Sequence, residues 1–207
     1  MLKRPQIIII VAIVVIVAGA LAYVALTSSR GLDASAILGA VPDWAMEFGA
    51  RDAPMVAIEF YDPLCPYCAV LHYRLHDEFE RLIAEGRLRL VLLPLPVHGN
   101  SSLVIIDKLH CAYRHGVNAL HVLNMWYSAL IKYAVNKTED DILAVAKQLE
   151  SYRCNETLAM DRIMSMLQSF EKAGITIRGT PTLIVIKNDR IMVIEGARVE
   201  ALKSILT

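Results

Sequence analysis

The sequence predicts an α/β domain with a helical insertion, preceded by one N-terminal transmembrane helix. Three observations predict this class. The first is a run of about 20 residues without a charge, 7–26, which has the length of a membrane-spanning helix. The second is an alternation of strand-like and helix-like segments within 41–207. The third is a region of helical spacing inside that domain, about 102–173, that is nearly free of glycine and proline.

The N-terminal run reads IIIIVAIVVIVAGALAYVAL and is apolar on every face, which favours a membrane span over a soluble core helix. Lys3 and Arg4 precede it, so the positive-inside tendency keeps a tail of residues 1–6 in the cytoplasm. A cleaved signal peptide is the alternative, although its apolar region is typically only about 7 to 15 residues. We therefore expect a single-pass protein of the cell membrane, with residues 27–40 as a linker and the following domain on the extracytoplasmic side.

The charge balance and the cysteines limit the possible functions. The chain has 21 basic and 21 acidic residues. Nucleic-acid binding needs a concentrated basic face, so we expect no nucleic-acid partner. The four cysteines, Cys65, Cys68, Cys111 and Cys154, all follow the apolar run. An even number of thiols in a translocated domain fits a compartment where disulfides persist.

The first half of the domain alternates strand and helix. Residues 27–54 look like a linker followed by one short helix. The β-branched and aromatic residues of Met55–Tyr61 predict a buried strand, ended by the Asp-Pro pair that follows. Residues 69–85 carry apolar side chains at helical spacing until a glycine stops them, and 88–96 predict a second buried strand ended by prolines.

The helical insertion follows the second strand. Its segments begin after small or polar residues, and Thr138 and Asn155 are placed as N-caps. The four segments with helical spacing are Ser102–His115, Ala119–Val135, Glu139–Glu150 and Glu156–Ala173.

The end of the chain returns to strand-like residues. Thr182–Asn188 and Ile191–Gly196 flank Asp189-Arg190 and predict a β-hairpin. Val199–Leu206 predicts a closing helix. The chain has no internal repeat and no low-complexity tract.

Two cysteines of the stretch DPLCPYCAV lie at the predicted strand-to-helix junction. A cysteine in the first turn of a helix faces unpaired N–H groups, which favour the thiolate. Cys65 would be the exposed nucleophile, and Cys68, one turn further and more buried, would resolve a mixed disulfide. A structural staple over so few residues would stabilise little. A metal site needs about four ligands, and Cys111 and Cys154 add no second CxxC, so we expect no metal and no other cofactor.

Glu59 lies inside an otherwise apolar strand, where a buried carboxylate is costly. Two interpretations stay open. Glu59 takes a solvent-facing or edge position, or it lies under the dithiol and accepts the proton of Cys68 when that thiol attacks.

The stretch IRGTPTLIV places Pro181 directly before a strand. A proline there is an ordinary edge device in most sequences. A cis peptide bond would instead bring the backbone of Thr180 beside Cys65 and offer a strand edge to a substrate peptide.

Together these residues resemble the thioredoxin superfamily and, more narrowly, the DsbA group of extracytoplasmic thiol-disulfide oxidoreductases. The resemblance covers about residues 40–207 and rests on EFYDPLCPYC with its acidic residue, the helical insertion, the GTPT turn, and the closing hairpin and helix. It implies the thioredoxin fold. It also implies that Cys65 is the nucleophile, Cys68 the resolving cysteine, Glu59 the buried acid, and Pro181 a cis-proline preceded by Thr180.

The resemblance has departures. Pro66 and Tyr67 stand where DsbA itself has Pro-His, and Pro-Tyr also occurs in DsbG-like isomerases and in glutaredoxins, so oxidising strength stays open. The sequence shows no separate N-terminal dimerisation domain of the isomerase type, which favours the oxidase. Some family members carry a second, structural disulfide at positions like those of Cys111 and Cys154, and two free buried thiols are the alternative.

The expected function is donation of the Cys65–Cys68 disulfide to reduced exported proteins. The family implies reoxidation by a quinone-linked membrane partner. A disulfide reductase or isomerase is the alternative within enzymes. A peptide-binding chaperone or assembly factor, in which the CxxC is incidental, is the alternative from another class.

Overall fold

The computed structural model describes residues 31–155 and 157–207. The predicted cytoplasmic tail, 1–6, and transmembrane anchor, 7–26, lie outside the described residues. Within the described part of the chain, none of the helices combines the length and the apolar character that crossing a bilayer requires.

A five-stranded mixed sheet forms the centre of the domain, in the order β1-β3-β2-β4-β5. The central strand β2 (Met55–Tyr61) runs parallel to β3 (Leu88–Pro94) and antiparallel to β4 (Thr182–Lys187). The edges are β1 (Met46–Phe48), antiparallel to β3, and β5 (Arg190–Glu195), antiparallel to β4. Every residue of β2 is buried, because the strand is paired on both sides and covered on both faces.

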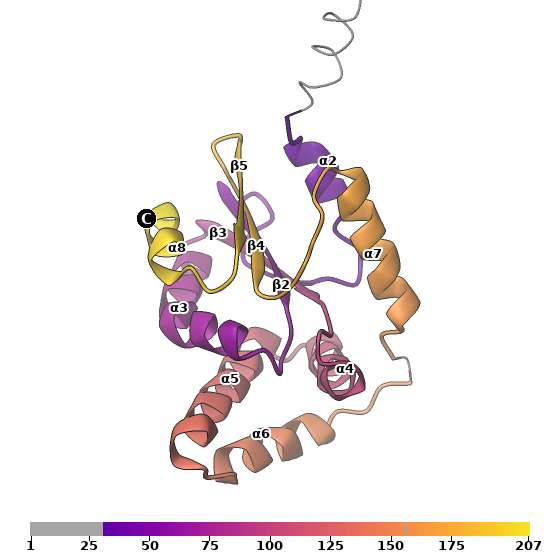
Figure 1. Ribbon diagram of the computed structural model, residues 1–207, viewed down its shortest axis with the longest axis vertical. Coiled ribbons are helices and arrows are strands. Elements are labelled where there is room, and N and C mark those ends of the chain that lie inside the picture. Colours follow the sequence, from indigo (N-terminus) through magenta and orange to yellow (C-terminus); the bar gives the residue numbers. More distant parts are fainter. Residues whose placement is uncertain (1–30, 156) are drawn as a thin grey trace, which may run out of the picture. The chain divides into compact units, whose positions relative to one another are not determined.

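Helices cover both faces of the sheet (Figure 1). On one face, the ring of Phe60 packs edge-on against that of Phe170, with 4.9 Å between centroids. Successive side chains of a strand point to opposite faces, so the neighbouring Glu59 points to the other layer. The Phe60 face carries α2 (Ala34–Gly39) and α7 (Met160–Lys172), and the Glu59 face carries α3 (Pro66–Ala84) and α8 (Val199–Leu206).

The helical insertion is confirmed as four helices between β3 and β4. They are α4 (Asn100–Arg114), α5 (Ala119–Asn136), α6 (Asp140–Glu150) and α7. In Figure 1, α5 lies beside the first half of α3, so the insertion borders the strand-to-helix junction that holds the CxxC.

The predicted N-caps of two insertion helices were wrong. The N-cap of α6 is the residue after Thr138, and the N-cap of α7 is Ala159 rather than Asn155. Helix α7 begins later than predicted, because its N-cap Ala159 has an extended backbone, with φ of −72° and ψ of 149°. The backbone N–H of Leu158 donates to the Asp107 carboxylate at 2.8 Å, which ties the residue before this N-cap to α4.

Two short elements precede β2. Helix α2 is a short helix of the kind expected within 27–54, but it lies inside the range 27–40 that we expected to be a linker, and its Ile37 is fully buried. Strand β1 was not predicted, because three residues are too few to show an alternation. It is held to β3 by the main-chain pairing and by an ion pair of 2.8 Å between Glu47 and Arg89.

The C-terminal hairpin is confirmed, with its turn one residue earlier than expected. Asn188 and Asp189 form the turn, with φ values of 51° and 60°. Asn and Asp tolerate this left-handed region better than other non-glycine residues do, because their short polar side chains bond locally.

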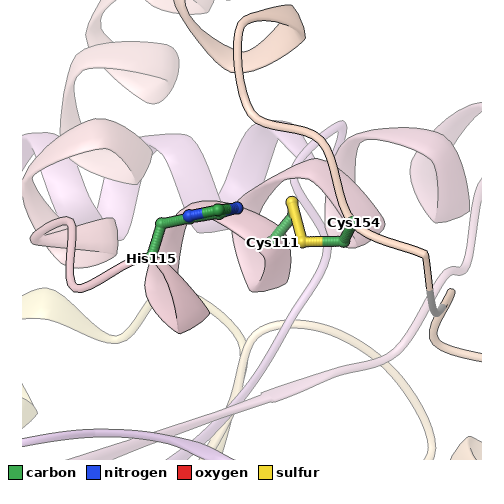
Figure 2. A group of neighbouring side chains, drawn as sticks. All are labelled: Cys111, His115 and Cys154. Carbon is green, nitrogen blue, oxygen red and sulfur yellow. A yellow bond between two sulfur atoms is a disulfide. The ribbon is translucent and has the colours of Figure 1, made fainter.

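A disulfide joins Cys111 of α4 to Cys154 in the connection between α6 and α7, with 2.04 Å between the sulfurs (Figure 2). The two cysteines are 43 residues apart in sequence. Closing a loop of this length stabilises the fold by about 4 kcal/mol in the chain-entropy model. The imidazole of His115 extends toward the disulfide (Figure 2). Both sulfurs are bonded to each other, so neither is available as a thiolate ligand in this state.

Candidate redox site

Cys65 is the N-cap residue of α3, and Pro66 takes the first helical position. Proline is favoured there, because its missing N–H would have no helical partner. The pKa of the Cys65 thiol is lowered to about 6, chiefly because the Cys68 thiol donates a hydrogen bond to its sulfur. Burial opposes this shift, while backbone N–H groups of Tyr67 and Cys68 add to it. Cys65 is therefore mostly thiolate at neutral pH.

Cys68 lies one turn further along α3 and is fully buried. Burial raises the pKa of its thiol far above the usual range, and the hydrogen bond to Cys65 and the charge of Glu59 act in the same direction. Cys65 retains 4% of its surface, so it is less exposed than the nucleophile we expected, but it is more exposed than Cys68. The pair thus contains one thiolate that is almost buried and one thiol that is fully buried.

The peptide bond between Thr180 and Pro181 is cis. In its thiol form, Cys65 donates from Sγ to the carbonyl oxygen of Thr180 at 3.4 Å. The Oγ1 atom of Thr180 is buried and has no hydrogen-bond partner among the described residues. Its hydroxyl is one of the groups that lower the pKa of Cys65, so it is an available donor once Cys65 is a thiolate.

Asp62 holds the loop before Cys65. Its fully buried carboxylate accepts hydrogen bonds from the backbone N–H groups of Leu64 at 2.7 Å and His98 at 3.0 Å. The Ser102 hydroxyl also donates to it, at 2.7 Å. The sequence indicates Asp62 only as the end of a strand, because two of its partners, His98 and Ser102, lie 36 and 40 residues away and no local pattern reveals them.

Helix α5 braces the same loop from the insertion. The indole N–H of Trp126 donates to the carbonyl of Pro63 at 2.8 Å, and the phenol of Tyr127 donates to the carbonyl of Asp62 at 2.9 Å. The loop before Cys65 is therefore held by hydrogen bonds to the side chain of Asp62 and to the backbone carbonyls of Asp62 and Pro63.

Glu59 is fully buried in the middle of the sheet, so the edge or solvent-facing interpretation was wrong. Its charge raises the pKa of Cys68, so the carboxylate lies near enough to act on that thiol electrostatically. The Nε2 atom of His72 lies 3.1 and 3.0 Å from its two carboxylate oxygens. The Nδ1 atom of His72 lies 2.8 Å from the Oδ1 atom of Asn124.

The sequence did not reveal this buried set of polar side chains from β2, α3 and α5. The only available signal was position, because His72 follows Cys68 by one helical turn and therefore shares its face of α3.

Two hollows flank Cys65. The first is a groove of about 470 Å³ between α3 and the end of α5. Its apolar lining includes Leu64, Pro66, Val70, Tyr73, Ile131 and Val135. The second, of about 240 Å³, is lined by residues around the cis peptide bond, Thr180 and Pro181 among them.

The match to a known family decides the classification. The family model described as Thioredoxin matches residues 43–207. The chain belongs to the thioredoxin superfamily. Its fold is DsbA-like within that superfamily, with the helical insertion between β3 and β4. The expected membership is confirmed. No curated protein matches the sequence.

Solved structures share this thioredoxin-superfamily fold at low identity. A periplasmic thioredoxin-like protein from Salmonella enterica serovar Typhimurium is 22% identical, with a TM-score of 0.58 over 82% of this chain and 93% of the other. The catalytic domain of Proteus mirabilis ScsC is 20% identical, with a TM-score of 0.56 over 83% and 95%. Wolbachia pipientis α-DsbA1 is 17% identical, with a TM-score of 0.59 over 80% and 89%.

Proposed function

We propose that this protein is an extracytoplasmic thiol-disulfide oxidoreductase that donates the Cys65–Cys68 disulfide to exported proteins. The observation that carries the proposal is the opposite shift of the two thiols. The pKa of Cys65 is lowered to about 6, and that of Cys68 is raised. A stabilised thiolate favours the reduced protein, which makes the corresponding disulfide a stronger oxidant.

The reaction begins when a substrate thiolate attacks the Cys65 sulfur of the oxidised protein. The bond between Cys65 and Cys68 breaks, a bond between the substrate and Cys65 forms, and Cys68 leaves as a thiolate. Cys68 is fully buried and favours the neutral thiol, so this thiolate takes up a proton. Glu59, beneath the dithiol, is the group through which that proton passes.

A second substrate thiolate completes the transfer by attacking the substrate sulfur of the mixed disulfide. Cys65 leaves as a thiolate, and its lowered pKa makes it a good leaving group. The substrate then contains a disulfide, and its two electrons reside in the Cys65–Cys68 dithiol.

Substrate chains would bind in extended form across the two hollows. The backbone at Thr180 lies beside Cys65 and can pair with a peptide strand. The apolar groove begins at Leu64 and Pro66 on either side of the nucleophile, and it suits the apolar side chains that an unfolded substrate exposes.

We further propose a setting for this chemistry. The apolar run 7–26 anchors the protein in the cell membrane with its domain outside the cytoplasm. The Cys111–Cys154 disulfide suits an oxidising compartment. A quinone-linked membrane protein would reoxidise the dithiol, and the anchor would hold both partners in one plane. No resident cofactor and no nucleic acid enter the proposal.

A refolding assay tests the function. The oxidised full-length protein is mixed with reduced, unfolded ribonuclease A, and the return of ribonuclease activity is followed. We expect disulfide transfer with the wild type, none with Cys65→Ser, and retained transfer with the Cys111→Ala/Cys154→Ala double variant. Full cellular function of Cys65→Ser would support the chaperone alternative and contradict the proposal.

A further inference from the structure

Three buried polar side chains, from β2, α3 and α5, contact one another. Glu59 and His72 are fully buried, and Asn124 retains 7% of its surface. The Nε2 atom of His72 faces both carboxylate oxygens of Glu59, at 3.1 and 3.0 Å, and its Nδ1 atom faces the Oδ1 atom of Asn124 at 2.8 Å. Carboxylate and amide oxygens only accept hydrogen bonds, so both ring nitrogens must carry hydrogen. This arrangement suits an imidazolium at His72.

The other groups that face His72 do not compete for its charge. Tyr127 of α5 lies with its ring centroid 4.9 Å from the imidazole, and burial raises its pKa well above the usual value, so it is a neutral phenol. Cys68, one turn earlier on α3, is held as a neutral thiol. Burial acts to lower the pKa of His72, but attraction to Glu59 and the hydrogen bonds to Glu59 and Asn124 outweigh it, and the pKa is raised.

We propose that His72 is a positioning residue that supplies, through Glu59, the proton exchanged with Cys68. This inference rests on the proposed function and deepens it. When the substrate breaks the Cys65–Cys68 bond, Nε2–H of His72 gives its proton to the Glu59 carboxylate, and Glu59 passes one proton to the Cys68 thiolate. The products are a neutral imidazole, an ionised Glu59 and a neutral Cys68 thiol. Charge balances. The substrate thiolate brings one negative charge, and after the step that charge is on Glu59, which no longer has a cationic His72 beside it.

Asn124 is suited to both protonation states of His72. In the structure its Oδ1 atom faces Nδ1, and its Nδ2 atom is buried without a hydrogen-bond partner among the described residues. A rotation of the amide by half a turn would make Nδ2 the donor to Nδ1 of a neutral imidazole. One side chain can therefore accept from the charged ring and donate to the neutral one.

The test compares His72→Gln with His76→Gln in the full-length protein. Gln at residue 72 can still hydrogen-bond but cannot carry the proton, whereas His76, one turn later on α3, is partly exposed and pairs with Asp77. The rate of mixed-disulfide formation with a reduced peptide is followed by tryptophan fluorescence, since Trp126 bonds the loop before Cys65. The rate is measured from pH 5 to 9. At each pH it is divided by the fraction of the peptide that is thiolate, which gives the corrected rate.

In the wild type and in His76→Gln, the corrected rate should fall as pH rises, because His72 loses its proton. In His72→Gln the rate at pH 7 should drop by about a hundredfold or more, the size expected for loss of a proton donor, and the fall with pH should disappear. The absorbance titration of the Cys65 thiolate should keep its midpoint at about 6. A His72→Gln profile with the wild-type shape would overturn the proposal, because a purely structural role lowers the rate without removing the pH dependence.

Nitrogen NMR of the His72 ring in the oxidised wild type gives a second readout that needs no variant to fold. Two protonated ring nitrogens at pH 7 support the proposal, and a neutral imidazole overturns it. The two proposals can be contradicted separately. If the wild type exchanges disulfides but its His72 is neutral, only the proton relay is contradicted. If His72 is an imidazolium but the protein has no exchange activity, the proposed function is contradicted.

Discussion

The Sγ atom of Cys65 lies 3.4 Å from the carbonyl oxygen of Thr180, 115 residues later in the sequence. The fold makes this contact by placing the start of α3 and the start of β4 at the same end of the central sheet. The Cys65 sulfur and the backbone at the cis peptide bond therefore meet at one point, although they come from different segments.

Thr180→Val should raise the pKa of Cys65. Valine keeps the shape of threonine but removes the buried hydroxyl that favours the thiolate. A hydrogen bond to a charged group contributes about 1.5 kcal/mol or more, which corresponds to a shift of about one pKa unit. Absorbance of the thiolate against pH measures the shift. A midpoint that stays at about 6 would show that the hydroxyl does not contribute.

The reduction potential should depend on pH in two regimes. Below about pH 6 the reduced protein holds two thiol protons, and above it only that of Cys68. The slope should therefore fall from about 59 mV to about 30 mV per pH unit as pH rises through this value. Folding lowers the pKa of Cys65, so the Cys65 thiolate stabilises the reduced form. This stabilisation is lost as pH falls through about 6 and the thiolate takes up a proton. A single slope from pH 5 to 8 would contradict the lowered pKa.

Asp62→Ala should destabilise the domain by about 2 to 4 kcal/mol, because it leaves the N–H of Leu64 and the hydroxyl of Ser102 without their acceptor. Urea unfolding measures this free energy. Asp77→Ala is the matched control, since that side chain is 93% exposed, and it should change stability by less than about 0.5 kcal/mol. Equal effects of the two variants would show that the loop does not depend on Asp62.

The sequence predicts the parts of the site that local pattern determines. The spacing of Cys65 and Cys68 and their place between a strand and a helix are visible within ten or so residues, so the dithiol and its helix could be predicted. The burial of Glu59 could not be predicted, because alternation within β2 does not reveal that β3 and β4 pair with its two edges.

The partners of the site were missed for a related reason. His72 and Asn124 are ordinary polar residues on helices, and their contact spans 52 positions of sequence. One short helix was expected within 27–54, but the position of α2 inside the expected linker was not predicted, because six residues are too few to show a helical period. The local chemistry is thus readable from the sequence, whereas its supporting contacts depend on the assembled fold.

Removing the disulfide in the Cys111→Ala/Cys154→Ala double variant should cost about 4 kcal/mol of stability, because the unfolded chain regains a long open loop. The pKa of Cys65 should stay at about 6, since neither cysteine belongs to its hydrogen-bonding set. Urea unfolding and the thiolate titration measure the two quantities. A loss below about 1 kcal/mol would contradict a stabilising role for the disulfide.

The reduction potential of the Cys65–Cys68 pair, measured at pH 7 by equilibration with a glutathione buffer, tests the central claim most directly. A pKa of about 6 for Cys65 is lower than the value of about 7 for thioredoxin and higher than that of about 3.5 for DsbA. A disulfide donor with this thiolate should have a potential between about −230 and −120 mV. A value of about −270 mV or below, like that of thioredoxin, would reverse the direction of electron flow and contradict the account.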